Sequence, residues 1–253
     1  MSWPSFKTLW LPARSQQPEW LDADDIPAQD LQRNLDDLRW LNRYLGNHWL
    51  LCTALQRVWR QVGCPSHLRV LDVGTGAGDI PAVLTHWGER RGVHIAVVAI
   101  DSHHGVLQYM RSVQSLPPSI TCAQADGLWL PFRARTFDVV LCSTMLHHLD
   151  WQQGIALLQS MAAVARYGVV VTDLVRSRLY YYAARLMLSM IACHEVTRHD
   201  GPLSVLRAYS VGEVREMARL AGLTPVRVST ALGYRFVLVY GPPAHEKVAT
   251  DGT

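Results

Sequence analysis

Three glycines at alternate positions form the part of this sequence that is best suited to hold a ligand. They are Gly74, Gly76 and Gly78. An apolar run over residues 70–73 precedes them, and Asp72 and Asp79 lie near the two ends of the segment. Glycines between a strand and a helix let the backbone turn tightly and approach a ligand without a Cβ. Because two carboxylates would repel a pyrophosphate, and because the spacing is not G-x-G-x-x-G, the pattern favours a ligand with cationic groups and ribose hydroxyls.

Polar residues also follow the next apolar runs along the chain. Residues 94–100 read as a buried strand that ends in Asp101, which lies 101 − 78 = 23 residues beyond the last glycine of the turn. The next two expected strands, at residues 119–123 and 137–142, are followed by Asp126-Gly127 and by Ser143. An acid about 20 residues beyond a glycine turn binds ribose hydroxyls in doubly wound sheets.

These ordered motifs resemble the class I (Rossmann-like) S-adenosylmethionine-dependent methyltransferases, and in particular small bacterial ones of polyketide, phenolic-lipid or quinone pathways. The resemblance covers roughly residues 68–173. It implies that S-adenosyl-L-methionine is the cofactor, with Asp72 at its methionine end, Asp101 at the ribose hydroxyls and Asp126 at the adenine amino group. The other core positions expected to bind the cofactor are Gly74, Thr75, Gly76, Gly78, Ser102, Gly127 and Ser143.

Strands and helices are expected to alternate through the middle of the chain, which is the pattern of a parallel sheet covered on both faces. Together with the resemblance, this predicts an α/β fold: a three-layer, Rossmann-like, seven-stranded, mostly parallel sheet with an antiparallel C-terminal hairpin and helical caps. We expect an N-terminal extension and helical lid over residues 1–66 and a cofactor-binding core over 67–241. The core carries a helical cap at about residues 176–209, and residues 242–253 form a flexible tail.

Composition narrows the function further. The net charge of +3 is small and comes without a run of Lys or Arg, so nucleic acid is not an expected partner. The five cysteines are scattered and contain no C-x-x-C pair, which favours a reducing, cytoplasmic location. The longest apolar stretch, residues 179–193, is interrupted by Arg185 and is shorter than the roughly 20 residues that a membrane span needs.

A helical segment precedes the glycine turn. Leucines recur at three- and four-residue intervals up to Gly46, which is expected to end the first helix. The small bacterial methyltransferases named above carry a similar stretch, which forms a lid there. Asn42 and Arg43 are therefore candidate contacts for the cofactor or the acceptor, and a solvated helix face is the alternative.

Two adjacent histidines, His147 and His148, follow the strand expected over residues 137–142. Histidine titrates near neutral pH and is a common metal ligand. Adjacent side chains diverge on a helix or a strand, however, and the sequence shows no further cluster of ligands. We therefore expect packing and hydrogen bonding beneath the cofactor, and no metal.

The acceptor is expected to bind near residues 176–209. An apolar helix there must be covered by the sheet, by the N-terminal helices, by a second copy in a homodimer or by a lipophilic acceptor. A polar group of residues follows, for which a surface loop is the default expectation. In the alternative, His199 or His194 takes a proton from the acceptor and is the catalytic base.

The sequence thus predicts a methyltransferase that acts on an oxygen of a small, hydrophobic acceptor, aromatic or polyketide-derived. Amide or nucleobase nitrogen is disfavoured, because residues 143–146 read Ser-Thr-Met-Leu instead of the [N/D]-P-P-[Y/F] signature of such enzymes. A C-methyltransferase of the quinone-biosynthesis type is the first alternative. A protein that binds S-adenosylmethionine without catalysis is the second, and a nicotinamide-dependent oxidoreductase is disfavoured by the glycine spacing and by Asp72.

Overall fold

A single seven-stranded sheet forms the centre of the computed structural model, which describes residues 12–23, 26–113, 116–191 and 193–241. The spatial order of the strands is β3-β2-β1-β4-β5-β7-β6. Their bounds are β1 His67–Val73, β2 His94–Asp101, β3 Ile120–Gln124, β4 Phe137–Ser143, β5 Ala165–Leu174, β6 Val226–Ala231 and β7 Arg235–Tyr240. β7 pairs antiparallel with both β5 and β6, whereas β1 to β5 pair parallel. The predicted α/β fold, with its antiparallel C-terminal hairpin, is confirmed.

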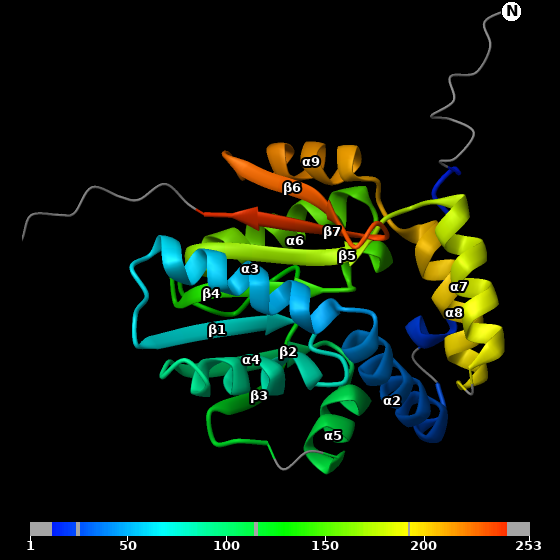
Figure 1. Ribbon diagram of the computed structural model, residues 1–253, viewed down its shortest axis with the longest axis horizontal. Coiled ribbons are helices and arrows are strands. Elements are labelled where there is room, and N and C mark those ends of the chain that lie inside the picture. The colour runs from blue at the N-terminus through cyan, green and yellow to red at the C-terminus, as the bar shows by residue number, and fades with distance from the viewer. Residues whose placement is uncertain (1–11, 24–25, 114–115, 192, 242–253) are drawn as a thin grey trace, which may run out of the picture.

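Helices cover both faces of this sheet (Figure 1). On one face lie α3 Asn47–Gln61, α4 Asp79–Glu89 and α5 His104–Val113, and on the other lie α6 Trp151–Val164 and α9 Val211–Leu220. Two separate apolar clusters fill the space between sheet and helices. β4 and β5 are buried on both faces, and their apolar residues run almost without interruption, as expected for central parallel strands.

The remaining helices gather at the end of the sheet toward which the parallel strands point (Figure 1). They are η1 Trp20–Asp22, α2 Ala28–Tyr44, η2 Leu146–His148, α7 Arg178–Met190 and α8 Glu195–Arg207. α2 ends before Gly46, as predicted, and Gly46 has a φ of 76°. Because the carboxyl ends of all parallel strands meet at this edge, the side chains that follow them face the same helices.

One expectation about these caps is wrong. The polar group of residues after α7 is not a surface loop: it begins α8, whose buried residues include Thr197 and Asp200. The helix shows little segregation of polar and apolar residues, and Gly201-Pro202 lies inside it. Because of both features, hydrophobic periodicity in the sequence does not predict a helix here.

Residues 12–23, which precede α2, pack against the helices at the carboxyl edge of the sheet. The backbone N–H of Ser15 donates to Leu206 O in α8, and Glu19 is only 4% exposed. Residues 12–23 therefore take part in the packing at the carboxyl edge of the sheet. The tail expected over residues 242–253 lies outside the described residues. Within the described ranges, no helix has the length and apolar character to cross a bilayer.

Candidate functional site

The glycine turn joins β1 to α4 at the carboxyl edge of the sheet. Gly74, Gly76 and Gly78 all have positive φ, at 68°, 52° and 70°, which L side chains adopt only with strain. A Cβ at Gly74 or Gly78 would collide with Met145 or Met110 at 2.6 Å. At Gly76 a Cβ would meet no atom within 4 Å. The backbone at Gly76 is therefore open to a ligand, whereas the glycines on either side are needed for packing.

Buried polar atoms without partners lie beside this turn. Asp72 is 1% exposed, and its carboxylate has no partner of ideal hydrogen-bond geometry; its polar neighbour is the buried hydroxyl of Thr75, which is otherwise unpaired and acts to lower the pKa of Asp72. Burial raises the pKa of Asp72 to about 7. A buried carboxylate without a partner is costly, and a bound cation would remove that cost.

Asp101 fastens the end of β2 to the glycine turn. One of its oxygens accepts from the N–H of Gly76 at 3.1 Å, and the other accepts from the N–H of His103 at 3.0 Å. Burial raises the pKa of Asp101, and these backbone donors partly offset the effect. The second contact lies just before α5, so the capping role considered from the sequence is present together with the contact to the turn.

The next positions along the same edge are also brought to the turn. The N–H of Ala125 donates to Asp101 O, which places the exposed Asp126 beside Asp101. Gly127 is packed so closely that a Cβ would approach Val73 to 2.8 Å. Ser102 is exposed, and its carbonyl accepts from Gln124 at 2.8 Å.

Asn42 connects α2 to the end of the glycine turn. Its amide donates to Asp79 Oδ2 at 3.2 Å, and Asp79 is the first residue of α4. His48, at the start of α3, contacts the same oxygen with its Nε2 at 2.5 Å. α2 and α3 are thus held against the turn by a carboxylate that is only 7% exposed.

Ser143 is part of a buried network at the end of β4. The amide of Asn47 donates to its hydroxyl at 2.9 Å, and the hydroxyl of Thr172 lies 3.0 Å away. Thr172 also donates to Asn47 Oδ1 at 3.1 Å. The side chain of Ser143 is consequently engaged by the protein, so its backbone is the part that remains for a ligand.

Three of the predicted site residues have other surroundings. Arg43 is exposed, and its guanidinium lies over the ring of Tyr44. His194 Nε2 lies 3.4 Å from the carboxylate of Asp30 in α2. His199 stacks on Trp20 with ring centroids 4.0 Å apart and bonds to Asp200 at 2.7 Å. None of these contacts reaches the glycine turn, so the roles of the three residues in binding and catalysis stay predictions.

A different histidine lies buried at the carboxyl edge. His147 is 2% exposed, and its Nδ1 lies 2.7 Å from Asp173 Oδ1, while its backbone N–H donates to Asp173 Oδ2 at 3.0 Å. Burial alone would raise the pKa of Asp173, but His147 overcomes this and lowers it. Asp173 is therefore ionised and can only accept, so that the proton of this contact is on His147 Nδ1.

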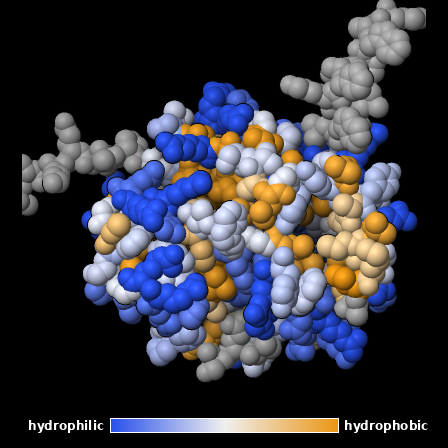
Figure 2. Space-filling model, viewed as in Figure 1, coloured by the Kyte–Doolittle hydropathy of each residue, from blue (hydrophilic) through white to orange (hydrophobic). Residues whose placement is uncertain are grey.

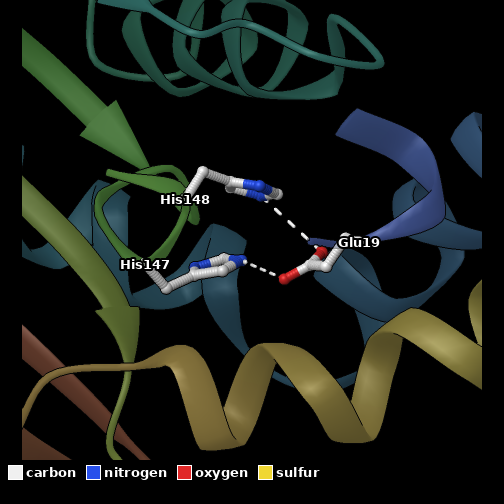
Figure 3. A group of neighbouring side chains, drawn as sticks. All are labelled: Glu19, His147 and His148. Atoms are coloured by element: carbon white, nitrogen blue, oxygen red, sulfur yellow. Dashed lines mark ion pairs between the residues drawn. The ribbon is translucent and has the colours of Figure 1, made fainter. Parts of the chain in front are cut away.

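His148 has an equivalent partner, and both rings point at Glu19 (Figure 3). His148 Nδ1 lies 2.7 Å from Asp22 Oδ1. The Nε2 atoms of His147 and His148 lie 3.7 and 3.9 Å from the two oxygens of Glu19. Burial raises the pKa of Glu19 to about 7, although His148 and Arg207 oppose the shift.

The expectation that the side chains of the adjacent His147 and His148 diverge is wrong. The two imidazoles do not diverge: their centroids are 4.2 Å apart and their planes are inclined by only 36°. They lie at the end of η2, a single 3-10 turn of three residues, where the regular helical offset between neighbours does not apply. Among the described residues, Glu19, His147 and His148 are a group whose ligand atoms all lie within 4.8 Å of one another.

Sequence reasoning missed most of the residues that close the site. The set comprises Glu19, Asp22, Asn47, His48, Thr172, Asp173 and Arg207. Their contacts join segments that are separated in sequence, by 26 residues between His147 and Asp173 and by 126 residues between Asp22 and His148. Asp173 alone carries a local signal, because it is an acid near the end of a strongly apolar strand.

The residues present fit S-adenosylmethionine. Asp72 offers an unpaired carboxylate for a cation, Gly76 offers open backbone, and Asp101 is aligned beside both. A pyrophosphate would instead meet the carboxylates of Asp72, Asp79 and Asp101. The site therefore suits a cationic ligand with a ribose better than a dinucleotide.

Comparisons with known proteins agree with this assignment. Residues 70–168 match the family model described as a methyltransferase domain. No curated protein matches the sequence.

Solved structures with the same fold include three methyltransferases. A SAM-dependent methyltransferase from Aquifex aeolicus is 20% identical, with 74% of this chain and 88% of that chain covered and a TM-score of 0.50. Magnesium protoporphyrin IX methyltransferase from Synechocystis PCC 6803 with bound SAH is 16% identical, with 87% and 99% covered and a TM-score of 0.55. DszA carbon methyltransferase is 17% identical, with 87% and 62% covered and a TM-score of 0.61. At these identities the likeness establishes the fold.

Proposed function

We propose that the chain is an S-adenosylmethionine-dependent methyltransferase that methylates an oxygen of a small, hydrophobic acceptor, aromatic or polyketide-derived. The match of residues 70–168 to a methyltransferase domain and the fold of the sheet support this proposal. When bound, the cofactor would supply a methyl group on a sulfonium sulfur: the acceptor oxygen forms a bond to the methyl carbon, the sulfur–methyl bond breaks, and S-adenosylhomocysteine leaves. The protein positions the two reactants, which must approach to about 3 Å along the sulfur–methyl axis.

The observation that carries the proposal is an apolar face on α7. Its exposed members are Leu179, Tyr182, Leu186 and Met190, which are between 57% and 71% exposed. Their spacing of three and four residues places them on one side of the helix. Leu188 is the one residue of α7 that is fully buried, so most apolar side chains of this helix do not pack in the core. Figure 2 shows apolar residues gathered over α7, at the right of the view.

The start of α7 is attached to the carboxyl edge of the sheet. The ring of Tyr180 packs against that of Tyr234 at 6.2 Å, and the hydroxyl of Tyr234 donates to the carbonyl of Leu45 between α2 and α3. α7 therefore begins where α2, α3 and the β6–β7 turn meet. A lipophilic acceptor bound along α7 would reach the cofactor from this side, and the lid would exclude water.

A base is required only if the acceptor hydroxyl must lose its proton at the transition state. His199 and His194 are the residues proposed for this step from the sequence. The proton would pass from the acceptor oxygen to an imidazole nitrogen and then to solvent.

Methylation at carbon is the alternative with a specific observation in its favour. The DszA carbon methyltransferase aligns with a TM-score of 0.61, above the 0.55 of the magnesium protoporphyrin IX methyltransferase. A protein that binds S-adenosylmethionine without catalysis is the other alternative. We further propose that the enzyme acts in the cytoplasm and has no nucleic-acid partner. A second copy of the chain in a homodimer would be another way to cover the apolar face of α7.

An acceptor panel tests the proposal. The full chain is incubated with methyl-labelled cofactor and a series of phenols, polyketide-like enols and quinols, and the products are identified by mass and by alkaline cleavage of methyl esters. Methyl ethers or esters support oxygen transfer, whereas a new carbon–methyl bond selects the alternative. Cofactor binding with no product from any acceptor or from a cell extract would favour the non-catalytic reading.

A matched pair of variants tests the role of α7. Leu186→Glu adds a charge to the proposed acceptor surface, and Leu220→Glu adds one to α9, where Leu220 is 45% exposed. Only the first should raise KM for the acceptor, by about tenfold, which corresponds to the ~1.4 kcal/mol of a lost apolar contact. Equal KM values in the two variants would remove α7 from the acceptor site. Sedimentation of both variants shows whether α7 instead joins two copies.

A further inference from the structure

The cluster of Glu19, His147 and His148 is not used by the cofactor site described above. It joins the N-terminal segment to η2, and it is buried apart from a partly exposed edge at His148. We propose that these three side chains form a binding site for a zinc-class divalent metal ion, with one nitrogen from each histidine and one or both oxygens of Glu19 as ligands. The proposal does not depend on the acceptor of the methyl group.

The two imidazoles are oriented as in metal sites. Asp173 holds Nδ1 of His147 and Asp22 holds Nδ1 of His148, each at 2.7 Å. Carboxylates on Nδ1 fix the tautomer and the ring orientation of metal-bound histidines and make the other nitrogen more basic. Nε2 of both rings then carries a lone pair, and both atoms face the same carboxylate (Figure 3).

The separations suit a shared ion better than hydrogen bonds. Glu19 lies 3.7 Å from His147 Nε2 and 3.9 Å from His148 Nε2, beyond hydrogen-bond range. Ligand atoms that lie about 2.1 Å from one zinc ion are roughly 3.4 Å apart in tetrahedral geometry. The two carboxylate–nitrogen separations exceed this value by a few tenths of an ångström, and the three ligand atoms all lie within 4.8 Å of one another, so adjustment of the side chains would bring them to one ion.

Glu19 supplies an independent observation. Its side chain is 3% exposed, and Oε1 is buried without a hydrogen bond. Arg207 forms an ion pair with this oxygen, and its Nε lies 3.5 Å from Oε1. The other donors of Arg207 are directed elsewhere, to the carbonyls of Gln17 and His148 and to Asp22. A buried carboxylate whose two oxygens each face an imidazole lone pair is unfavourable unless a cation or additional protons lie between them.

The ligand set indicates the class of ion. Imidazole and carboxylate suit zinc, iron, cobalt and nickel, whereas calcium and magnesium prefer oxygen ligands alone. Three protein ligands leave at least one coordination position for water or another ligand, as in open zinc sites. The competing occupant is protons: both rings could be protonated and form ion pairs with Glu19.

Metal titration of the full, untagged chain distinguishes these two occupants. The protein is dialysed against a chelator, and Co²⁺ is added while visible absorption is recorded. Zn²⁺ affinity is measured by competition with a chromogenic chelator. We expect one ion per chain, cobalt bands that Zn²⁺ abolishes, and a loss of zinc affinity of at least about tenfold in Glu19→Gln and in His148→Ala.

A second histidine pair provides the matched control. His67 and His94 lie side by side on β1 and β2 with ring centroids 5.7 Å apart, and within the described part of the chain no carboxylate pairs with either ring. Their replacement by alanine should leave both the stoichiometry and the affinity unchanged. Thermal melting verifies that each variant is folded. Should His148→Ala fail to fold, Asp22→Asn removes the charge behind His148 while it keeps an oxygen for the N–H of Glu19, and it should still weaken zinc binding by about tenfold.

Three results would overturn the proposal. They are the absence of an ion in the wild-type chain at micromolar metal, binding that survives Glu19→Gln and His148→Ala unchanged, and binding that disappears when His67 and His94 are replaced. The first result would leave protonated histidines as the occupants of the cluster. The last would identify an adventitious surface site.

Discussion

The two sides of the carboxyl edge differ in how their side chains are held. On the cofactor side, the glycine turn and Asp101 are positioned by backbone conformation and by contacts across 25 residues or fewer. On the other side, the buried Glu19 meets His147 across 147 − 19 = 128 residues and Arg207 across 207 − 19 = 188 residues. The first side is encoded in local sequence, whereas the second exists only once the chain has folded.

Removal of Asp173 is expected to have the largest effect on this second side. Asp173→Ala leaves His147 buried without the partner of its Nδ1 and frees the N–H of residue 147. Breaking a buried, hydrogen-bonded charge pair costs roughly 3–5 kcal/mol of unfolding free energy. Urea denaturation of the metal-free protein measures it.

Asp138→Ala is the control for that loss. Asp138 accepts from the N–H of Arg69 at 2.8 Å, but Arg166 is 3.9 Å away and the pair is partly exposed. Its removal should cost about 1 kcal/mol. Similar losses in both variants would mean that the buried pair is no more important than a surface one.

The cofactor side is tested by two glycines with nearly equal backbone strain. Gly76 and Gly92 both have positive φ, and a Cβ at either would meet nothing within 4 Å. Alanine at each should therefore cost a similar ~1–2 kcal/mol of stability. Only Gly76→Ala places a methyl group where the cofactor lies against the turn, so its affinity for S-adenosylhomocysteine should fall at least about tenfold. Calorimetric titration measures the affinity, and equal affinities would show that the ligand does not contact Gly76.

These contrasts explain which parts of the molecule the sequence could predict. The strands, the turn and the antiparallel hairpin follow from apolar runs, glycines and the positions of Asp72 and Asp101, and they agree with the structure. Local patterns are enough there, because the central strands are apolar runs buried on both faces and the turns carry their own residue signals.

The other side gives no such signal. α8 has no apolar stripe, and Glu19 lies in a segment without periodicity, yet both are buried because of what they contact. The convergence of His147 and His148 depends on a single 3-10 turn and on two distant carboxylates. No spacing rule predicts that geometry, because charge pairing across the chain is decided by the tertiary fold.

Asp72 connects stability with cofactor binding on the cofactor side. In the folded protein it keeps its proton up to about pH 7, while in the unfolded chain it loses the proton near pH 4. The folded state therefore binds more protons between these values, so Asp72 lowers the unfolding free energy as the pH rises from 4 to 7. Asp72→Asn should stabilise the ligand-free protein at neutral pH by about 1–2 kcal/mol and flatten this pH dependence.

Cofactor binding should reverse the same effect. A cation beside Asp72 favours the ionised carboxylate, so binding at pH 6 to 7 should release a proton. Titrations of S-adenosylmethionine in buffers of different ionisation enthalpy detect that release, and Asp72→Asn should abolish it and weaken binding. Proton release that is equal in both proteins would place the cation elsewhere.

His199 should show the smallest effect, although the sequence proposes it as a base. It is stacked on Trp20 and bonded to Asp200, and Asp200 also accepts from the N–H groups of Trp20 and Leu21. These contacts hold η1 against α8. His199→Gln should then cost about 1 kcal/mol of stability, through the lost stacking, and should change kcat by less than about threefold. A larger loss of kcat, together with the disappearance of a step near neutral pH from the pH profile, would instead make His199 the residue that takes the proton from the acceptor.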